Sequence, residues 1–396
     1  MKLRWIAMAM VMTAGVLATS LPARAQGLND VLTRLLSNNC GSIGGPTNAP
    51  LGPGLQNVCN FPTTDGASSA TGSVGSESRA GGAGQLEIYR RLRQRQGQGQ
   101  GAASADSDGA RGLGVFVSAD YQNYDQDSNR FEGGFSRDTV GGTAGVDYMF
   151  SNGFVIGTAL NYAHEFGNYD GVGGGFDHNA YGIQLYGSVV PIPRLFIDTV
   201  LGYTRKEYGF ERRASVTLAP NSRIVAGSTT GDTDGNEFRI SLNTGYDFQL
   251  GMFTFGPRAG VSYRETTMDS FREQGNTGLE LSYDNQNAQS LTTTAGIYGA
   301  MAISTGFGVI VPQGTFEYVH EFLDDQRSVG FRLVQEVAQQ RFLFQTDRPD
   351  RDYFNLSVGA SMVLPSGLQP FLNFRELIAY RDRSSHTVTV GLRIPF

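Results

Sequence analysis

The sequence lacks any long hydrophobic run after its first residues, and it has few charged side chains. No apolar stretch beyond residue 25 approaches the roughly 18 residues that a transmembrane helix requires. Charged residues make up 17% of the chain and the net charge is -6, so the strongly basic composition typical of nucleic-acid binding is missing. These absences exclude helical membrane spans and argue against a nucleic-acid partner.

Cysteine is almost absent as well. Cys40 and Cys59 are the only two, and both precede the strand-rich part of the chain. In an exported chain they either pair in a disulfide that closes a modest loop or remain two free thiols, and the sequence leaves both alternatives open. No metal-ligand spacing, phosphate-binding loop or nucleophile elbow is present, and no cofactor is expected.

The N-terminus has the pattern of a secretory signal peptide. Two basic residues precede an apolar run over residues 5–17, and Ala23 and Ala25 give the small-residue motif that signal peptidase reads. The run is too short to cross a membrane as a helix. We expect entry into the export translocon and cleavage between Ala25 and Gln26, so that residues 1–25 form the signal peptide.

The following segment shows little apolar periodicity. Residues 26–83 are rich in Gly, Ser, Pro, Ala and Asn, a composition typical of disordered or linker chain. We expect them to form a largely disordered, passenger-like segment. Residues 84–110 continue as a linker.

One part of this linker, residues 84–96, has helical spacing. Leu86, Tyr89 and Leu92 fall on one face of such a helix. Four arginines crowd around that face: Arg90, Arg91, Arg93 and Arg95. We therefore expect a short helix with one apolar side and a strongly basic surround.

From residue 111 onward, apolar and polar residues alternate with a period of two, which indicates β-strands. Abundant Gly and an aromatic content of 11% are typical of large antiparallel sheets. Twelve strands are predicted, near residues 112–124, 138–150, 153–166, 177–190, 193–213, 234–250, 252–266, 290–304, 308–322, 352–364, 368–380 and 385–396. Their connections alternate strictly between tight turns and long polar loops, so all long loops share one end of the sheet.

The polar rows of these strands distinguish a membrane barrel from a soluble sandwich. Around residues 238–250, Phe238, Ile240 and Leu242 lie on one face, whereas Arg239 and Asp247 lie on the other. A soluble core would bury apolar side chains on that second face, and the strands exceed the usual length of about 5–6 residues. A closed barrel places the polar row in a wet lumen, exposes the apolar row to lipid and leaves no unpaired edge. We therefore predict an all-β, 12-stranded antiparallel transmembrane barrel over residues 111–396.

Two further features concern the ends of the strands. Aromatic residues near strand ends fit girdles at the membrane interfaces: Tyr121, Tyr148, Phe150, Tyr203, Tyr263 and Tyr380. The chain itself ends on an apolar row with a period of two: Val388, Val390, Leu392, Ile394 and Phe396. This ending resembles the C-terminal signal of bacterial outer-membrane proteins, which implies recognition by the barrel-assembly machinery after escort by periplasmic chaperones.

Residues 111–396 resemble the translocator domain of autotransporters, the type V secretion family. The resemblance is carried by the number of strands, the length of the domain, the ending VTVGLRIPF and the segment VPQGTFEYVHEF. It implies a monomer in the lipid of the bacterial outer membrane, with a helix through the lumen that joins an exported passenger to the barrel. Residues 84–96 occupy the position of that helix, where the arginines would face inward carboxylates such as Asp120, Asp147 or Glu317.

The sequence departs from the family in its passenger, because residues 26–83 have no repeat and no room for a sizeable core. The paired asparagines Asn38 and Asn39 lie far upstream of the helix, so we expect no self-cleavage within it. Two functions remain open. Either the barrel displays or exports this short segment through its lumen, or it is an integral pore or loop-mediated adhesin with a periplasmic N-terminal segment.

An enzyme is not expected. The four histidines, His164, His178, His320 and His386, are scattered over different strands. A protease-like set would require His178 to meet Asp177, Asp324 and Asp325 at the long-loop end. Asp and His in polar loops are more often simply solvated.

Overall fold

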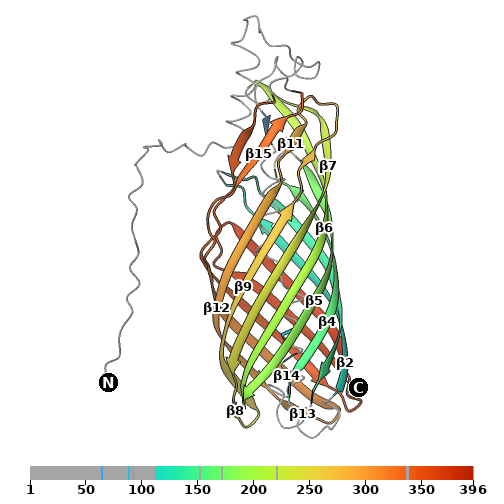
Figure 1. The fold of residues 1–396 in the computed structure, drawn as a ribbon, viewed down its shortest axis with the longest axis vertical. Coiled ribbons are helices and arrows are strands. Elements are labelled where there is room, and N and C mark those ends of the chain that lie inside the picture. Colours follow the sequence, from blue (N-terminus) through green and yellow to red (C-terminus); the bar gives the residue numbers. More distant parts are fainter. Residues whose placement is uncertain are drawn as a thin grey trace, which may run out of the picture.

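The computed structural model describes residues 64–65, 88–89, 92, 112–129, 131–150, 153–170, 173–219, 222–335 and 339–395. Within them, an antiparallel sheet of fifteen strands closes into a tall cylinder (Figure 1). Three of these strands are short accessory pieces: β1 (Thr64–Asp65), β8 (Phe248–Leu250) and β13 (Ile303–Thr305). The twelve strands of the wall are β2 (Gly112–Gln126), β3 (Phe135–Met149), β4 (Val155–Tyr169), β5 (Gly174–Ile192), β6 (Leu195–Ala219), β7 (Ser222–Tyr246), β9 (Phe253–Met268), β12 (Gln286–Met301), β14 (Gly308–Glu321), β17 (Asp352–Val363), β18 (Gln369–Ile378) and β19 (Arg383–Pro395).

The predicted twelve-stranded antiparallel barrel is confirmed. Consecutive wall strands pair with each other, and the first and last close the ring through the β2–β19 ladder, in which Val117 faces Leu392. Strand boundaries differ most for β6 and β7, which are 25 residues long and form a hairpin that extends past the rim at the long-loop end (Figure 1). No helix in the described part of the chain is long and apolar enough to cross a membrane.

The two faces of the wall are those that the period-two pattern predicts. On β19, Val388 and Val390 are exposed on the outside, whereas Thr389 and Arg393 are buried on the inside. On β7, Leu242 points outward and its neighbour Ser241 points inward. Burial therefore alternates residue by residue because each strand separates a polar interior from an apolar exterior.

Outward tyrosines mark the boundary of the apolar exterior near the long-loop end. Five strands that run toward the long-loop end each carry such a tyrosine. Its hydroxyl donates to an acceptor that lies closer to the long-loop end: Tyr121 to Asp138, Tyr162 to Asn179, Tyr203 to Asn236, Tyr263 to Glu265 and Tyr318 to Asp352. At the short-turn end, the Phe150 ring lies 4.9 Å from that of Tyr148 and 5.6 Å from that of Phe154. These positions suit rings that rest in lipid while their polar ends reach water. Tyr380 differs from the predicted girdle because it follows β18 and lies in a loop.

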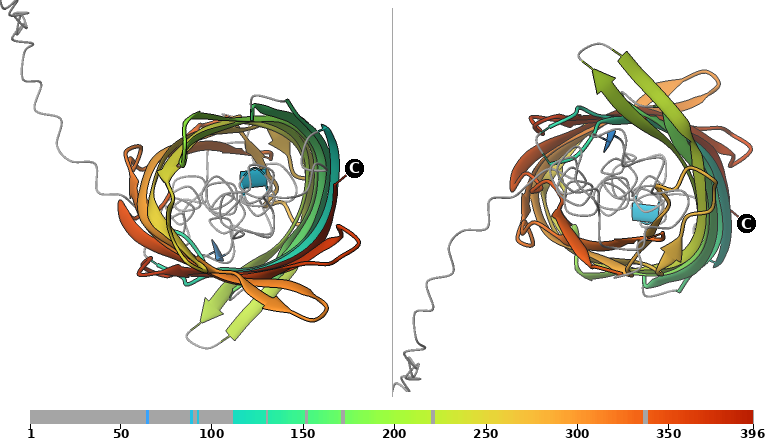
Figure 2. Two further views of the ribbon diagram at one scale, coloured as in Figure 1. Left: turned by 90° about the horizontal axis from the view of Figure 1, so that it is seen from below. Right: turned by 90° about the horizontal axis from the view of Figure 1, so that it is seen from above.

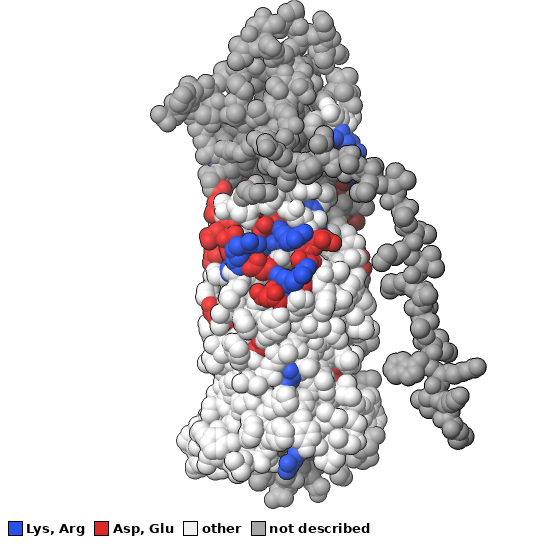
Figure 3. Space-filling model, turned by 90° about the vertical axis from the view of Figure 1, so that its left-hand side faces the viewer, with Lys and Arg blue, Asp and Glu red and all other residues white. Residues whose placement is uncertain are grey.

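Charge on the exterior follows the same boundary. Figure 3 shows Lys, Arg, Asp and Glu side chains gathered in a band near the long-loop end, with an almost uncharged surface below it. Ion pairs in the connections at the long-loop end include Arg351–Asp324 at 2.9 Å and Arg381–Asp350 at 3.1 Å. The uncharged zone is the part of the wall suited to contact with acyl chains.

The long connections are not simply polar loops, and this part of the prediction was wrong. Two of them contribute a second, four-stranded sheet with the order β10–β11–β15–β16. The connection between β9 and β12 supplies β10 (Phe271–Arg272) and β11 (Leu281–Tyr283), and the connection between β14 and β17 supplies β15 (Ser328–Leu333) and β16 (Phe342–Gln345). The sheet lies at the long-loop end of the barrel, where β11 and β15 are labelled in Figure 1.

Candidate functional site

The lumen changes character in three layers along the barrel. Strand β6 illustrates this, because its buried inward residues include Val200 beside the apolar cluster, Lys206 in the middle and Phe210 near the long-loop end. An apolar cluster lies nearest the short-turn end, together with buried carboxylates such as Asp147 and Asp198. A charged network lies in the middle, and a mainly aromatic cluster lies near the long-loop end. Each layer combines side chains from several strands.

The apolar layer encloses part of the linker that precedes the barrel. The backbone of Ile88, Tyr89 and Leu92 is helical, and Figure 2 shows this short segment inside the ring of strands. Ile88 and Leu92 are fully buried and belong to one cluster with wall residues from β2, β4, β5 and β6. The wall residues of this cluster are Phe116, Val155, Ala159, Tyr186 and Val200.

The three described residues of this segment test only part of the predicted lumenal helix. Tyr89 and Leu92 lie inside the barrel as expected, together with Ile88, which the predicted apolar face did not include. The predicted carboxylates Asp120, Asp147 and Glu317 all belong to inward rows of their strands. Leu86 and the arginines Arg90, Arg91, Arg93 and Arg95 lie outside the described residues, so the complete helix and its basic side remain predictions.

The packing of this segment against the wall can be tested by removing one of the wall side chains. Replacing Phe116 by alanine removes a buried ring next to Ile88 and Leu92, a change that typically costs about 3–5 kcal/mol. We expect the segment to leave its position more often, so that trypsin cleaves faster after the arginines between residues 90 and 95 in the folded, detergent-solubilised protein. The neighbouring Val117→Ala variant is the control, since Val117 faces lipid. Equal cleavage rates in the two variants would contradict the contact.

The middle layer is a network of buried charges. Glu237 on β7 is its centre: one carboxylate oxygen lies 3.1 Å from Lys206 Nζ, and the other lies 2.6 Å from Arg239 Nη2 and 3.4 Å from Arg264 Nε. A separate pair joins Arg137 and Glu165 across β3 and β4 at 3.5 Å. The opposite charges offset the cost of removing them from bulk water.

The upper layer is a cluster of apolar and aromatic side chains inside the mouth of the barrel. The wall contributes inward residues from six strands: Tyr124, Phe135, Tyr169, Phe176, Tyr208, Phe210 and Met268. Their counterparts on the four-stranded sheet are Phe271, Leu281, Tyr283, Val329, Phe331, Leu333 and Phe344. Sequence reasoning missed this cluster, although large apolar residues at inward positions near the long-loop ends of strands were a usable signal.

A buried ion pair fixes the sheet to the wall beside this cluster. Arg212 on β6 donates from Nε to Glu273 Oε1 at 2.9 Å and from Nη2 to the carbonyl of Leu279 at 2.8 Å. Burial favours loss of the Arg212 proton, but the Glu273 carboxylate outweighs burial and holds the pKa of the guanidinium above its ordinary range. Burial beside the same carboxylate raises the pKa of the Tyr283 hydroxyl. Both groups therefore keep their protons at physiological pH.

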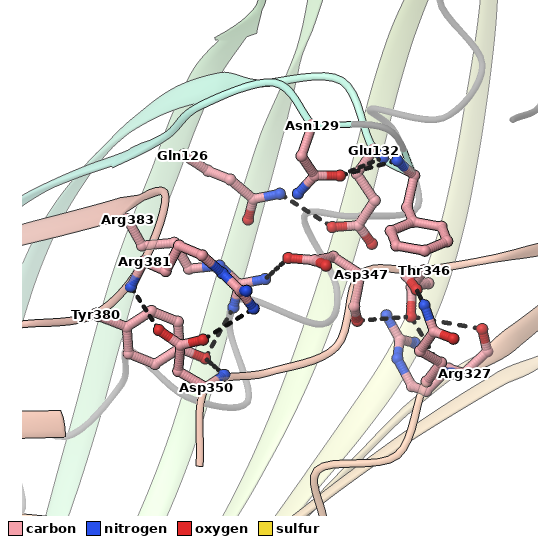
Figure 4. A network of polar contacts seen from close by, with 12 residues as sticks. Gln126, Asn129, Glu132, Arg327, Thr346, Asp347, Asp350, Tyr380, Arg381 and Arg383 are labelled. Atoms are coloured by element: carbon pink, nitrogen blue, oxygen red, sulfur yellow. Dashed lines mark hydrogen bonds and ion pairs between the residues drawn. The ribbon is translucent and has the colours of Figure 1, made fainter. Parts of the chain in front are cut away.

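Polar contacts also connect the loops around the rim (Figure 4). Arg381 donates to Asp350 through its backbone N–H and its guanidinium, and the backbone N–H of Asp350 donates to the Tyr380 hydroxyl at 3.1 Å. Gln126 donates to Glu132 at 3.0 Å. The backbone N–H of Asp127 donates to the carbonyl of Asp382 at 2.9 Å, so the loops after β2, β16 and β18 are joined to one another.

The histidines do not form a catalytic set. His178 is buried in the aromatic layer, with its ring 4.8 Å from that of Tyr208, whereas Asp177 next to it faces outward. Asp324 pairs with Arg351. The other three histidines lie outside the lumen, each beside a carboxylate: His164 near Asp177, His320 near Asp352 and His386 near Glu376. Among the residues with described positions, no group of three or more His, Cys, Asp or Glu is arranged to hold a metal ion.

Several predicted site residues fall where nothing is described. They are the cleavage-site residues Ala23, Ala25 and Gln26, the cysteines Cys40 and Cys59, and Phe396 of the predicted assembly signal. The other four members of that signal form the apolar outward row of β19: Val388, Val390, Leu392 and Ile394. The expectations for cleavage, disulfide formation and recognition of the last strand remain untested.

Known structures share the fold. The translocator domain of the autotransporter NalP from Neisseria meningitidis superposes with a TM-score of 0.57 at 13% identity, covering 79% of this chain and 96% of that one. The beta domain of the Bordetella autotransporter BrkA gives a TM-score of 0.52 at 18% identity, covering 72% and 100%.

Sequence comparison points to the same group. Outer membrane protein B of Rickettsia prowazekii is 21% identical over 96% of this chain, and the match spans 21% of that protein. The esterase EstA of Pseudomonas aeruginosa is 25% identical over 43% of this chain and 26% of its own length. The chain thus covers about a fifth to a quarter of these relatives. Residues 115–375 match the autotransporter beta-domain family, and the chain therefore belongs to this family of bacterial outer-membrane β-barrels.

Proposed function

We propose that the barrel carries its own N-terminal segment through the lumen and displays it at the cell surface. The supporting observation is that three successive parts of the chain lie in order along the barrel, from the long-loop end to the short-turn end. Thr64 and Asp65 of β1 pair with Val216 and Ser215 of β6 in the hairpin beyond the long-loop rim. Residues 88–92 lie inside the lumen, and β2 begins at the short-turn end, where Gly112 pairs with Met149.

The two ends of the barrel can be assigned to the two sides of the membrane, because outer-membrane barrels have short periplasmic turns and longer extracellular loops. A chain that meets the extracellular hairpin at residue 64 and starts its first wall strand at residue 112 has to cross the membrane between these points. The lumen, in which Ile88 and Leu92 lie, is the route that avoids the lipid. The printed descriptions of the structural neighbours name translocator and beta domains of autotransporters, which agrees with such a role.

We further propose the partners of the assembly pathway. The signal peptide directs the chain to the export translocon, periplasmic chaperones keep it unfolded, and the barrel-assembly machinery recognises its last strand before the monomer enters the lipid. The outward apolar row of β19, which includes Val388 and Val390, supports this last step. We propose no catalytic activity for the barrel.

An epitope inserted after Thr64 tests the display function. On intact cells, external protease is expected to remove this epitope, as it should remove a control epitope in the β6–β7 hairpin tip at residues 220–221. A second control epitope after Ser366, in the tight turn between β17 and β18, should resist. Protection of the first epitope while both controls behave as stated would reject display and favour the alternative, a pore or loop-mediated adhesin with a periplasmic N-terminal segment.

A further inference from the structure

The sheet formed by β10, β11, β15 and β16 lies inside the mouth of the barrel, where it packs against inward residues of six wall strands. We propose that it is a folded plug that seals the extracellular end of the lumen to small solutes, independently of residues 84–96. This inference goes beyond the proposed function, because it concerns the passage of small solutes. It applies whether the N-terminal segment is displayed at the cell surface or stays in the periplasm.

The plug has a hydrophobic core of its own, which it shares with the wall. Val329, Phe331 and Leu333 alternate along β15 and are all buried, as is Phe344 on the adjacent β16. Their rings continue into those of the wall: Phe271 stacks on Phe210 at 5.4 Å, and Tyr283 lies 6.4 Å from Phe331. Phe271 in turn stacks on Tyr283 at 4.8 Å, so ring contacts connect strand β6 of the wall with the strands of the plug, beside the buried Arg212–Glu273 pair.

The plug is built from two connections that leave the wall at different places. They join through the antiparallel β11–β15 ladder, in which Leu281 faces Leu333 and Tyr283 faces Phe331. Asp284 reinforces this junction, because its carboxylate accepts hydrogen bonds from Arg332 and Arg341, both at 2.6 Å. These arginines hold the pKa of Asp284 below its usual value even though burial opposes this. The two connections thus hold each other in place inside the mouth of the barrel.

The plug is also anchored to the wall. Glu273 of the loop after β10 pairs with Arg212, and the backbone of Gln274 exchanges two hydrogen bonds with Thr230 of β7 at 2.9 and 2.7 Å. The N–H of Leu281 donates to Glu273 at 2.9 Å. A buried charge pair and a backbone bridge at this edge restrict movement of the plug away from β6 and β7.

An apolar, close-packed layer is a barrier to ions. An ion that enters between these packed rings loses its hydration shell and finds no ligands among them, which is the physical basis of hydrophobic gates. The apolar layer around Ile88 and Leu92 lies at the other end of the lumen. Two barriers in series have a clear consequence: removal of either one leaves the lumen closed.

Planar-bilayer conductance of the full-length chain and its variants tests the plug. We expect the protein lacking residues 84–96 to remain closed. In that background, Phe344→Asp places a carboxylate in the plug core and should open the lumen, because losing such a buried ring shifts the closed-to-open equilibrium by about 100-fold or more. The control is Leu343→Asp, since Leu343 is adjacent on β16 but points away from the cluster, with 52% of its surface exposed compared with 2% for Phe344. It should stay closed.

Folding of each variant is checked by the mobility shift of the unheated barrel in detergent gels, and Phe344→Ala replaces Phe344→Asp if the latter fails to fold. A steady open-pore conductance on deletion of residues 84–96 alone would overturn the proposal. So would equal conductance of the Phe344 and Leu343 variants. Neither result depends on whether the N-terminal segment reaches the cell surface, so failure of the plug and failure of the display function are distinguishable.

Discussion

Replacing Arg212 by methionine is expected to destabilise the plug by about 3–5 kcal/mol, because this leaves the Glu273 carboxylate buried without its partner. Both side chains are almost completely inaccessible to solvent. The amide of Leu281 reports this change directly, since it donates to Glu273. Amide hydrogen exchange of peptides covering residues 271–283 should accelerate by roughly two to three orders of magnitude, at about tenfold for each 1.4 kcal/mol.

Two comparisons separate the ion pair from a general effect of losing charge. Arg213→Met removes the next arginine, which is exposed, and should change stability by no more than about 0.5 kcal/mol. The double variant Arg212→Met, Glu273→Met removes both charges and should recover most of the lost protection. Exchange that is equally fast in the Arg212 and Arg213 variants would show that the pair does not hold the plug.

Replacing Leu242 by arginine is expected to destabilise the barrel in lipid by about 2–4 kcal/mol, the cost of a lipid-facing cation near the middle of the bilayer. Leu242 lies on the outward row of β7, between Phe238 and Phe248, and 44% of its surface is exposed. An arginine at this outward position cannot reach the carboxylates inside the lumen. Urea unfolding of the protein in phospholipid vesicles measures the difference from the parent chain.

The matched control is Leu250→Arg. Leu250 continues the same outward row but ends it in β8, next to the turn at Gly251, where a long basic side chain reaches the headgroups. Near an interface the cost falls to about 0–1 kcal/mol. A similar loss in both variants would mean that the row does not cross the hydrocarbon as inferred.

Most of the barrel wall was predictable from the sequence. The number of strands, their antiparallel order and the face of each residue follow from alternation alone, as with outward Leu242 beside inward Ser241. This works because a membrane strand meets only two environments, and its residues alternate between them with a fixed period of two. The lumenal position of Leu92 was also expected, from the apolar spacing of its segment and the family resemblance. Ile88 was missed because it lies off the face that this spacing defined.

The plug was decided by tertiary structure. Its strands are only two to six residues long, so that even the alternation in β15 is brief, and they lie within segments that read as polar loops. Phe331 and Phe344 become core residues only because the closed wall brings the connections after β9 and β14 over the same mouth. Local alternation therefore determined the wall, whereas the plug depends on contacts between residues far apart in the chain, which no local pattern encodes.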